Sequence, residues 1–558
     1  MLPASGTAAS SAMDWQGRAQ FTVFDSDYGD GERFRTLLQR WRDDGARPAR
    51  LHYIALHASP LPGFRRIPQM DAGVTLDLLC APLDEALAQL DARLDAITLH
   101  AIAGTSFARA LARLAAPGAR LTASALTTAQ AHTLGGAGFA CTSGPDGTLR
   151  AVFTTRKPPS PWMRTPEPQR RAIVLGAGIA GAAACERLCA RGWHVTLVER
   201  HAQAASEASG NQAGIYMPLL SQDDNVMTRL SRAAFLYALA YWDTLGGIGP
   251  GARIHGAACG VLQLARGAQH AGVQRAIAER HGYPSEYAQW LEEGPASALL
   301  GSAAPDGAWL FRQAGWAQPA SVCAAMLDAC GSRLVRRFGA GSVRLVHGAG
   351  QWSALDASGT LVASAPVVIV ANGTGARHLA QTDALPLASV RGQVTYLAEG
   401  ALPALPFVLC REAYLTPAVK GWHSLGASYD ADPDPALRQA SQLENLVKIG
   451  SMLDNPALGG AAPLAGRVGF RCVAPDRLPL VGALPQQDDG ARIERLRQVP
   501  RQNGLYGLLG YASRGLAWAP LAAELLASQL DGEPLPLEAE LAAALDPARF
   551  LVRARRRL

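Results

Sequence analysis

The chain has 558 residues, a formal net charge of +6, and apolar residues at 49% of its positions. This length is too great for one hydrophobic core, so we expect at least two domains, and the composition excludes a disordered or fibrous chain. The mild positive charge permits an anionic partner without demonstrating one. The nine cysteines form no CxxC pair and are expected to be reduced, structural thiols. Neither a signal pattern nor a membrane-spanning run is found, so we expect a cytoplasmic protein with no membrane partner.

The first expected element is a strand at Phe21–Phe24, which runs into a glycine-bearing loop and then an amphipathic helix. This order is typical of the start of a nucleotide-binding domain. The loop, however, reads DYGDG at residues 27–31, with acidic side chains where a phosphate-binding loop needs bare backbone. The loop alone leaves three interpretations open: a cofactor site, an altered site, or only the shape of one.

A proline-rich segment separates two parts of the chain. Five prolines, at positions 158, 159, 161, 166 and 168, fall between Thr154 and Arg171. Because proline fixes φ and lacks an amide donor, this segment cannot join a central strand or helix. We therefore expect a first domain at residues 1–153, a semi-rigid linker at 154–170 and a second domain at 171–558.

The second domain opens on the strongest local signal in the sequence, RAIVLGAGIAGAAACERLCARGWHVTLVER. Gly176 permits a tight turn, Gly178 lets the backbone approach a pyrophosphate, and Gly181 lets the helix pack closely on the preceding strand. The N-terminus of that helix offers free N–H groups to the phosphates. Glu199, at the end of the next strand, can accept hydrogen bonds from a ribose. Together, the strands, the helix and the acid predict a dinucleotide site.

The other parts of this site are separated from it in the sequence. Small residues at 209–214 would let backbone amides approach a flat ring, although an ordinary surface turn is the alternative. An apolar strand ends before Asn372 and Gly373, and VRGQVTYL follows at 390–397. FAD domains are built from such separated pieces, whereas many NAD dehydrogenases use two contiguous halves. The layout therefore favours FAD over NAD.

Further motifs follow in order towards the end of the chain: ASGNQAGIYMPLL, the pair Gly315-Trp316, VVIVANG, VRGQVT, YLTP, LGASY, VGFRCVAPDRLPLVGALP and GLYGLLGYASRGLAWAPLAAELLASQL. With them, residues 171–558 resemble the glycine oxidase and D-amino-acid oxidase superfamily of flavin amine oxidases. The resemblance is particularly strong to the FAD-dependent domain of the bifunctional enzymes that make 5-methylaminomethyl-2-thiouridine in tRNA.

The resemblance implies an α/β protein whose D-amino-acid-oxidase-type FAD-binding fold carries an inserted antiparallel-sheet substrate subdomain. The FAD-binding pieces would be about 171–235, 330–395 and 465–545, and the substrate subdomain about 236–330 and 396–464. FAD would be bound non-covalently, because no Cys or His has a context that suggests attachment. The residues expected to bind FAD are Gly176, Gly178, Ile179, Ala180, Gly181, Glu199, Arg200, Ser209, Gly210, Asn211, Gln212, Gly214, Asn372, Gly373, Gly515 and Leu516.

The resemblance also implies the reaction. A carboxymethylaminomethyl group on the wobble uridine would lose a hydride to the flavin from the carbon between nitrogen and carboxylate. The resulting imine would hydrolyse to glyoxylate and aminomethyl-uridine. This chemistry needs neither a metal nor a strong protein base, which agrees with a sequence that lacks a compelling metal cluster or His/Asp pair.

Two arginines are the candidate catalytic and substrate-binding residues. Arg471, in VGFRCVAPDRLP, takes the place of the arginine that binds the substrate carboxylate in related glycine oxidases, and guanidinium binds carboxylate bidentately. A surface ion pair is its alternative role. Arg514, in YASRGL, is implied to line the substrate side, with structural support as the alternative. Tyr414 and Tyr429 are candidates to line the pocket, and a position buried in the core is the alternative for each.

The family, rather than the charge of the chain, implies a tRNA substrate. Basic residues that could contact phosphates cluster near the linker and at the end of the chain, although a solvated tail is the alternative. We expect a monomer that acts on tRNA. The basic residues are Arg156, Lys157, Arg164, Arg170, Arg171, Arg553, Arg555, Arg556 and Arg557.

The first domain resembles the S-adenosylmethionine-dependent methyltransferase domain of the same family. The strand pattern is kept, and residues 135–157 are expected to end the domain as paired strands. The functional positions differ: the glycine-rich loop is altered at 28–31, the ribose acid is His57, the Gly-Asp pair near the adenine is Ala81-Pro82, and the catalytic aspartate is absent from 100–104. These changes predict a Rossmann-like fold without S-adenosylmethionine binding or methyltransferase activity.

Three functions stay open on the sequence. The first is a tRNA-modifying flavin oxidoreductase with a non-catalytic first domain. The second is the full bifunctional enzyme, with His57 and His100 in place of acids. The third is an oxidase of free glycine or D-amino acids. A non-enzymatic flavin-binding protein is disfavoured, because the substrate-side motifs are present.

Overall fold

The structure, a computed structural model, describes residues 15–68, 71, 73–144, 147–154, 167–455, 458, 464–486 and 493–555. Two compact units divide the chain: Met1–His57 with Gln69–Pro158, and Ala58–Pro68 with Pro159–Leu558. All nine cysteines are free thiols, as expected. Of the described helices, none is long and apolar enough to cross a membrane. Most of the predicted linker lies outside the described residues, as do Arg156, Lys157, Arg164, Arg556 and Arg557.

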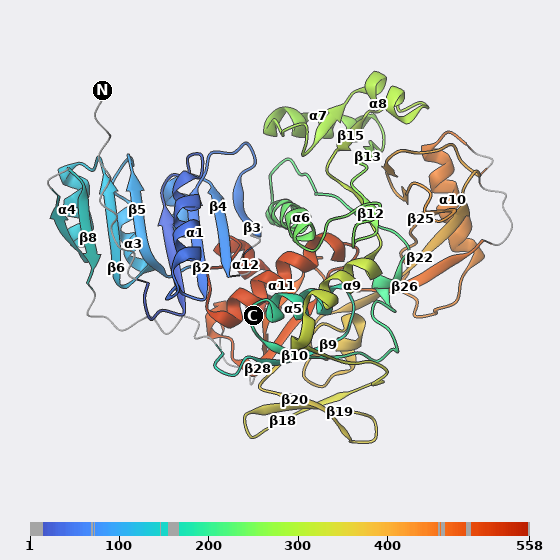
Figure 1. Cartoon of the computed structure of the whole chain (residues 1–558). Coiled ribbons are helices and arrows are strands. Elements are labelled where there is room, and N and C mark those ends of the chain that lie inside the picture. Colours follow the sequence, from blue (N-terminus) through green and yellow to red (C-terminus); the bar gives the residue numbers. More distant parts are fainter. Residues whose placement is uncertain are drawn as a thin grey trace. The chain divides into compact units, whose positions relative to one another are not determined.

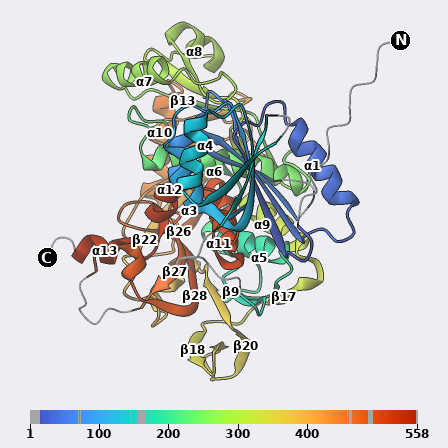
Figure 2. The same ribbon diagram turned by 90° about the vertical axis from the view of Figure 1, so that its left-hand side faces the viewer.

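The first unit is a mostly parallel sheet flanked by helices, which confirms the predicted Rossmann-like fold. Its strands follow the order β4-β2-β1-β5-β6-β8-β7 and are parallel from β4 to β6. β8 and β7 end the sheet as the expected antiparallel pair. The helix α1 lies on one face, and α3 and α4 lie on the other (Figure 2). The elements are β1 (Gln20–Asp25), α1 (Glu32–Asp43), β2 (Arg50–Leu56), β4 (Val74–Cys80), α2 (Leu83–Gln89), β5 (Leu94–His100), α3 (Phe107–Leu114), β6 (Ala115–Ser124), α4 (Thr128–Gly136), β7 (Phe139–Ser143) and β8 (Leu149–Phe153).

The second unit contains the sheet that the glycine motif predicts. Its strands follow the order β17-β10-β9-β21-β28-β27, in which only β27 is antiparallel to its neighbour. The helices α5, α9 and α11 lie beside this sheet, and the hairpin strands β18 to β20 lie at the bottom of Figure 1. The elements are β9 (Arg171–Leu175), α5 (Ile179–Cys189), β10 (His194–Val198), α9 (Pro319–Ala329), β17 (Leu334–Arg337), β18 (Arg344–Gly348), β19 (Gln351–Leu355), β20 (Leu361–Ala365), β21 (Val367–Val370), β27 (Leu480–Pro485), β28 (Arg501–Leu509) and α11 (Gly515–Asp531).

Alternating side chains of the central strand β9 explain why this sheet is covered on both faces. Ala172 and Val174 pack into the core that contains α5, α9 and α11. Ile173 and Leu175 point the other way, into a core shared with β18–β20. Because both faces are buried, the strand is a continuous apolar run, as is usual in parallel sheets.

A second large sheet forms the expected inserted subdomain and follows the order β14-β15-β13-β23-β24-β25-β22-β26. Its pairing is largely antiparallel, apart from the parallel neighbours β13 and β23. The strands β22 and β26 belong to pieces predicted to bind the cofactor, and they pair within this sheet. The elements are β13 (Val261–Leu264), α7 (Ala268–His281), β14 (Gln289–Leu291), α8 (Glu293–Leu300), β15 (Ala308–Phe311), β22 (Ala388–Ala398), β23 (Val408–Cys410), β24 (Tyr414–Leu415), β25 (Trp422–Gly426), α10 (Gln439–Met452) and β26 (Gly466–Val473).

Smaller elements complete the second unit. A short sheet follows the order β11-β16-β12. The long helix α6 packs against α11 and against α12. These elements are the 3-10 helix η1 (Ala208–Gly210), β11 (Gly214–Tyr216), α6 (Val226–Thr244), β12 (Gly256–Ala257), β16 (Gly315–Ala317), α12 (Ala539–Leu545) and α13 (Arg549–Arg555).

The segment Ala58–Pro68, which includes β3 (Gly63–Pro68), belongs to the second unit although it lies within the first unit's sequence. The guanidinium Nη1 of Arg66 lies 2.8 Å from Oε1 of Glu524 on α11, and both side chains are almost completely buried. Arg191 lies 2.7 Å from the same Glu524 oxygen. The second unit therefore takes part of its buried charge network from residues that precede the linker.

Candidate active site

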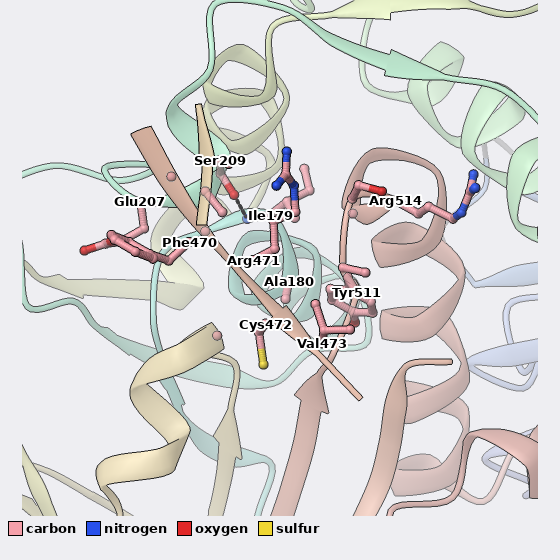
Figure 3. Close-up of a pocket in the computed structure, with 18 of the residues that line it drawn as sticks. Ile179, Ala180, Glu207, Ser209, Phe470, Arg471, Cys472, Val473, Tyr511 and Arg514 are labelled. Carbon is pink, nitrogen blue, oxygen red and sulfur yellow. Dashed lines mark hydrogen bonds between the residues drawn. The ribbon is translucent and has the colours of Figure 1, made fainter. Parts of the chain in front are cut away.

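A cavity of about 1030 Å3 lies in the second unit. Its lining residues come from the ends of β9 and β21, the N-termini of α5 and α11, the loop around η1, and the paired strands β22 and β26. This volume is at the upper end of the range for small-molecule and cofactor sites. Several of the lining residues are drawn in Figure 3.

Two of the three glycines of the G-x-G-x-x-G motif, Gly176 and Gly181, have no room for a side chain, and at Gly178 a side chain would be tightly packed. Gly176 has a φ of 97°, and a Cβ there would lie 2.7 Å from Cα of Asn372. At Gly178, a Cβ would lie 3.2 Å from Oγ of Ser209, and at Gly181 it would overlap the carbonyl oxygen of Gly176. The turn therefore places glycine backbone at the start of α5, where the helix faces the cavity, as dinucleotide binding requires.

The carboxylate of Glu199 is fixed by the backbone at the end of β10. One oxygen accepts a hydrogen bond of 2.7 Å from the Ala177 N–H, and the other accepts one of 2.9 Å from the His201 N–H. Its neighbour Arg200 is engaged by an ion pair with Glu207. Glu199 is buried and lines the cavity, and each of its carboxylate oxygens can accept a further hydrogen bond.

The small-residue loop at 206–211 is held by an arginine that the sequence did not single out. Arg467 on β26 donates hydrogen bonds of 2.7 Å to the carbonyls of Ser206 and Glu207, and one of 3.3 Å to Asn211. Burial lowers the pKa of Arg467. At the other end of the loop, Ser209 accepts a hydrogen bond of 3.0 Å from the Ile179 N–H, as Figure 3 shows. The loop is thus held against the start of α5.

Several features of the cavity fit FAD. The side-chain oxygen of Asn372 is buried against the cavity without a hydrogen-bond partner among the described residues. Both α5 and α11 begin at the cavity wall, and a Cβ at Gly515 would lie 2.9 Å from Ile179. Helix N-termini favour anionic groups, so the cavity offers two positive ends to a dinucleotide.

The guanidinium of Arg471 on β26 contacts two backbone carbonyl groups and the ring of Tyr429. Its Nη1 donates hydrogen bonds of 3.4 Å to the Arg391 carbonyl and 3.2 Å to the Ser428 carbonyl. Its guanidinium carbon is 4.2 Å from the centre of the Tyr429 ring, and a Cβ at Gly392 would overlap the guanidinium. In the part of the chain that the structure describes, no carboxylate pairs with it. A positioned guanidinium without a counter-ion can bind a carboxylate.

Arg514 and Arg477 add positive charge to the same cavity. Burial lowers the pKa of Arg514, and Arg477 lowers it further. Arg477 has a left-handed backbone, with a φ of 59°, and the sequence did not indicate it as a site residue. Neither guanidinium forms an ion pair with any described carboxylate. Figure 3 shows Arg471 and Arg514 as side chains of the cavity wall.

The two candidate tyrosines differ in exposure, although both line the cavity. Tyr414 is partly buried, and burial raises its pKa, whereas the nearby Arg471 lowers it. Tyr429 is 63% exposed, so the alternative of a core tyrosine is wrong for this residue.

The cavity brings together most of the predicted site residues. Gly181, Gly210 and Gln212 are not among the lining residues; Gly210 instead packs against Arg467. The lining residues that we predicted are Gly176, Gly178, Ile179, Ala180, Glu199, Arg200, Ser209, Asn211, Gly214, Asn372, Gly373, Tyr414, Tyr429, Arg471, Arg514, Gly515 and Leu516. The sequence did not indicate Arg467 or Arg477. The spacing between Arg467 and Arg471 is a signal that could have indicated Arg467, because it places both residues on one face of a strand.

The predicted basic patches are partly neutralised. Arg553 lies 2.7 Å from Asp476, and Arg170 lies 3.5 Å from Asp531. Arg171 donates a hydrogen bond to Gln169. The charges of Arg553 and Arg170 are therefore less available to phosphates than their sequence positions suggest.

In the first unit, the opening loop satisfies its own backbone donors. Asp27 accepts a hydrogen bond of 3.0 Å from the Gly29 N–H, and Asp30 accepts one of 2.9 Å from the Glu32 N–H. A Cβ atom at Gly31 would lie only 2.6 Å from the Tyr28 hydroxyl, so the tyrosine fills the space beside this glycine. The amides that could bind a cofactor are thus paired within the loop.

A polar cluster lies at the ends of β1 and β5 in the same unit. The buried Asp25 accepts hydrogen bonds of 2.6 Å from the Tyr53 hydroxyl and 2.8 Å from Nε of Arg33. Nε2 of His100 lies 3.3 Å from the other Asp25 oxygen. The ring of His57 makes an edge contact with Tyr28, with centroids 5.6 Å apart. Side chains at this edge of the sheet therefore contact one another.

Comparison with known proteins agrees with this geometry. The family model described as FAD dependent oxidoreductase matches residues 171–529. A Burkholderia thailandensis protein, named tRNA 5-methylaminomethyl-2-thiouridine biosynthesis bifunctional protein MnmC, is 40% identical over 97% of this chain and 92% of its own length. The chain belongs to the MnmC family. A Paraburkholderia xenovorans MnmC protein is 39% identical with the same coverage.

Solved structures share the fold of the oxidoreductase part of this MnmC-family chain. Iminodiacetate oxidase from Chelativorans sp. BNC1 is 23% identical, with a TM-score of 0.55, over 67% of this chain and 98% of its own. Glycine oxidase from Geobacillus kaustophilus is 19% identical, with a TM-score of 0.55, over 68% and 99%. These likenesses concern the fold alone. The expected family, fold class and enzyme class are confirmed: this MnmC-family chain is an FAD-dependent oxidoreductase.

Proposed function

We propose that this chain removes the carboxymethyl group from 5-carboxymethylaminomethyl-uridine, or its 2-thio form, at the wobble position of tRNA. The products are 5-aminomethyl-uridine and glyoxylate. The observation that carries the proposal is Arg471, a guanidinium in an FAD-sized cavity whose charge no described carboxylate neutralises. The tRNA substrate is supported by the names of the relatives that are 39–40% identical.

FAD, when bound, supplies the acceptor for the hydride that leaves the substrate. The N-terminus of α5 would hold the pyrophosphate of FAD beside Gly176 and Gly178, and Glu199 would accept hydrogen bonds from a ribose. The loop from Ser209 to Gly214 and the start of α11 would contact the rest of the cofactor. These roles rest on the positions of these residues in the cavity wall.

Arg471 would bind the substrate carboxylate, and Arg514, Tyr414 and Tyr429 would contact the rest of the substrate. The carboxylate held by Arg471 would orient the carbon between nitrogen and carboxylate, whose C–H bond would give up its hydride to the acceptor that FAD supplies when bound. The nitrogen lone pair forms the C=N bond, so the amine has to be unprotonated. The nearby positive charges of Arg471 and Arg514 favour the neutral amine. Water then adds to the imine, the C–N bond breaks, and glyoxylate leaves.

We propose that only the second of the two domains is catalytic. We propose a methyltransferase-like domain at 1–153, a proline-rich linker at 154–170 and the oxidoreductase at 171–558, with residues 58–68 serving the oxidoreductase. The first domain would not bind S-adenosylmethionine, because Asp27 and Asp30 occupy the donors of its loop. The relatives' bifunctional name makes methylation by the first domain the second candidate.

Product analysis separates the candidates. The full-length holoenzyme is incubated with tRNA that carries the carboxymethylaminomethyl group, and glyoxylate and nucleosides are measured. We expect equimolar glyoxylate and aminomethyl-uridine, with no methylaminomethyl-uridine after S-adenosylmethionine is added. Methylated product would support the second candidate. Glyoxylate from free glycine but none from tRNA would replace the proposal with an amino-acid oxidase.

A further inference from the structure

Tyr429 is an aromatic side chain exposed at the active-site cavity. Its residue is 63% exposed, although it lines the same cavity as Arg471. The Arg471 guanidinium covers one side of the ring at 4.2 Å from its centre. No described residue forms a hydrogen bond with the phenol. The ring is thus a flat surface backed by a cation, and most of the residue is open to solvent.

The chain around Tyr429 is held more firmly than an exposed loop usually is. Arg391 and Asp430 exchange two backbone hydrogen bonds, of 2.8 and 3.0 Å. The Asp430 carboxylate accepts hydrogen bonds of 3.0 Å from the Ser428 hydroxyl and 3.3 Å from Arg391. Arg391 and Ser428 are both fully buried. The backbone on both sides of the exposed ring is therefore fixed before any ligand arrives, which lowers the entropy cost of binding.

A fixed, exposed aromatic ring beside a cationic cavity is suited to a planar ligand with negative groups. Bases stack on aromatic side chains through their π faces, and each stacked base contributes about 1–3 kcal/mol of affinity. Free glycine offers no such face. Tyr429 thus distinguishes a substrate group carried on a nucleobase from the same group on a small amine.

We propose that Tyr429 is the platform on which a base of the substrate RNA stacks while Arg471 binds the carboxylate. This inference rests on the proposed tRNA substrate, and it adds the contact that selects a nucleic acid. One face of the Tyr429 ring lies on the Arg471 guanidinium, and the other face receives the base.

The test compares Tyr429→Ala and Tyr429→Phe with the wild-type holoenzyme. KM and kcat are measured with the modified tRNA, and the dissociation constant of glycolate, a small carboxylate probe of Arg471, is measured from the flavin absorbance spectrum. We expect Tyr429→Ala to raise the tRNA KM at least tenfold, Tyr429→Phe to change it less than threefold, and glycolate binding to change less than threefold. Val447→Ala, at a 60% exposed apolar residue of α10, is the matched control and should behave as wild type.

Two results would overturn the stacking role. In the first, Tyr429→Ala keeps the wild-type tRNA KM. In the second, it weakens glycolate as much as tRNA, which would make Tyr429 a support for Arg471 alone. If the wild-type enzyme itself releases no glyoxylate from tRNA, the proposed function fails and the stacking role fails with it. That failure is recognised in the wild type, before any variant is compared.

Discussion

The guanidinium of Arg471 lies directly over Gly392, so that a Cβ atom at position 392 would overlap it. The two residues are on the paired strands β26 and β22, two positions out of register, because Arg471 pairs with Val390. A glycine in the VRGQVT motif is therefore the reason that the arginine can lie flat against the sheet. This relationship connects a motif that the sequence analysis assigned to the FAD-binding pieces with the proposed carboxylate site.

Replacing that glycine should displace the carboxylate-binding group. We expect Gly392→Ala to raise the KM for tRNA about tenfold or more, because hydrogen bonds to charged groups contribute about 1.5–3 kcal/mol. FAD content should stay at the wild-type level. Gly294→Ala, in α8 with no neighbour within 4 Å of the added atom, is the control. A wild-type KM for Gly392→Ala would mean that Arg471 does not bind the substrate from this position.

The cofactor site should depend on Glu199. Glu199→Ala removes the acceptor for the Ala177 and His201 N–H groups and for the ribose, and an unsatisfied buried donor costs about 1–3 kcal/mol. We expect FAD affinity to fall at least tenfold, measured as flavin released during dialysis. The exposed Glu279→Ala variant should retain its flavin. Full retention by Glu199→Ala would contradict the ribose role.

The segment that precedes the linker should stabilise the oxidoreductase. Arg66→Met leaves buried Glu524 with less neutralising charge, and breaking a buried ion pair costs about 3–5 kcal/mol. The urea midpoint of flavin release from the full-length protein should fall accordingly. Arg65→Met changes the exposed neighbour and should leave the midpoint unchanged. Equal midpoints for the two variants would show that residues 58–68 do not contribute.

Acid should weaken the same network. Burial alone would raise the pKa of Glu524, but Arg191, Arg66 and Arg187 hold it well below its ordinary value. A carboxyl whose pKa is lower in the folded state stabilises the protein above the unfolded value of about 4.3, and this contribution is lost as pH falls below it. The unfolding free energy of the wild type should therefore fall below about pH 4.3. Glu524→Gln should be less stable at neutral pH and should show a shallower acid slope. Parallel slopes would assign the acid sensitivity to other carboxyls.

The cofactor half of the site could be predicted from local sequence. The apolar run from Ala172 to Leu175, the three glycines and Glu199 are adjacent in the chain, and each has one structural reason to be where it is. Backbone geometry within about thirty residues determines their arrangement. The same applies to the paired strands that end the first domain.

Contacts between distant segments could not be predicted in this way. The close approach of the Arg471 guanidinium to Gly392 depends on the register of β22 against β26, which no local pattern specifies. The burial of Arg66 against Glu524 joins residues 458 positions apart. Likewise, the exposure of Tyr429 follows from the fixed turn around Asp430, and its residue type alone favoured the core.

The most direct test of the proposed reaction is a single anaerobic mixing experiment with the holoenzyme and excess carboxymethylaminomethyl-modified tRNA. The flavin absorbance band and the glyoxylate released are measured together. The proposed reaction predicts complete bleaching of the flavin and one glyoxylate per flavin, with aminomethyl-uridine left in the tRNA. An oxidised spectrum that persists with tRNA, while free glycine bleaches it, would contradict the central claim.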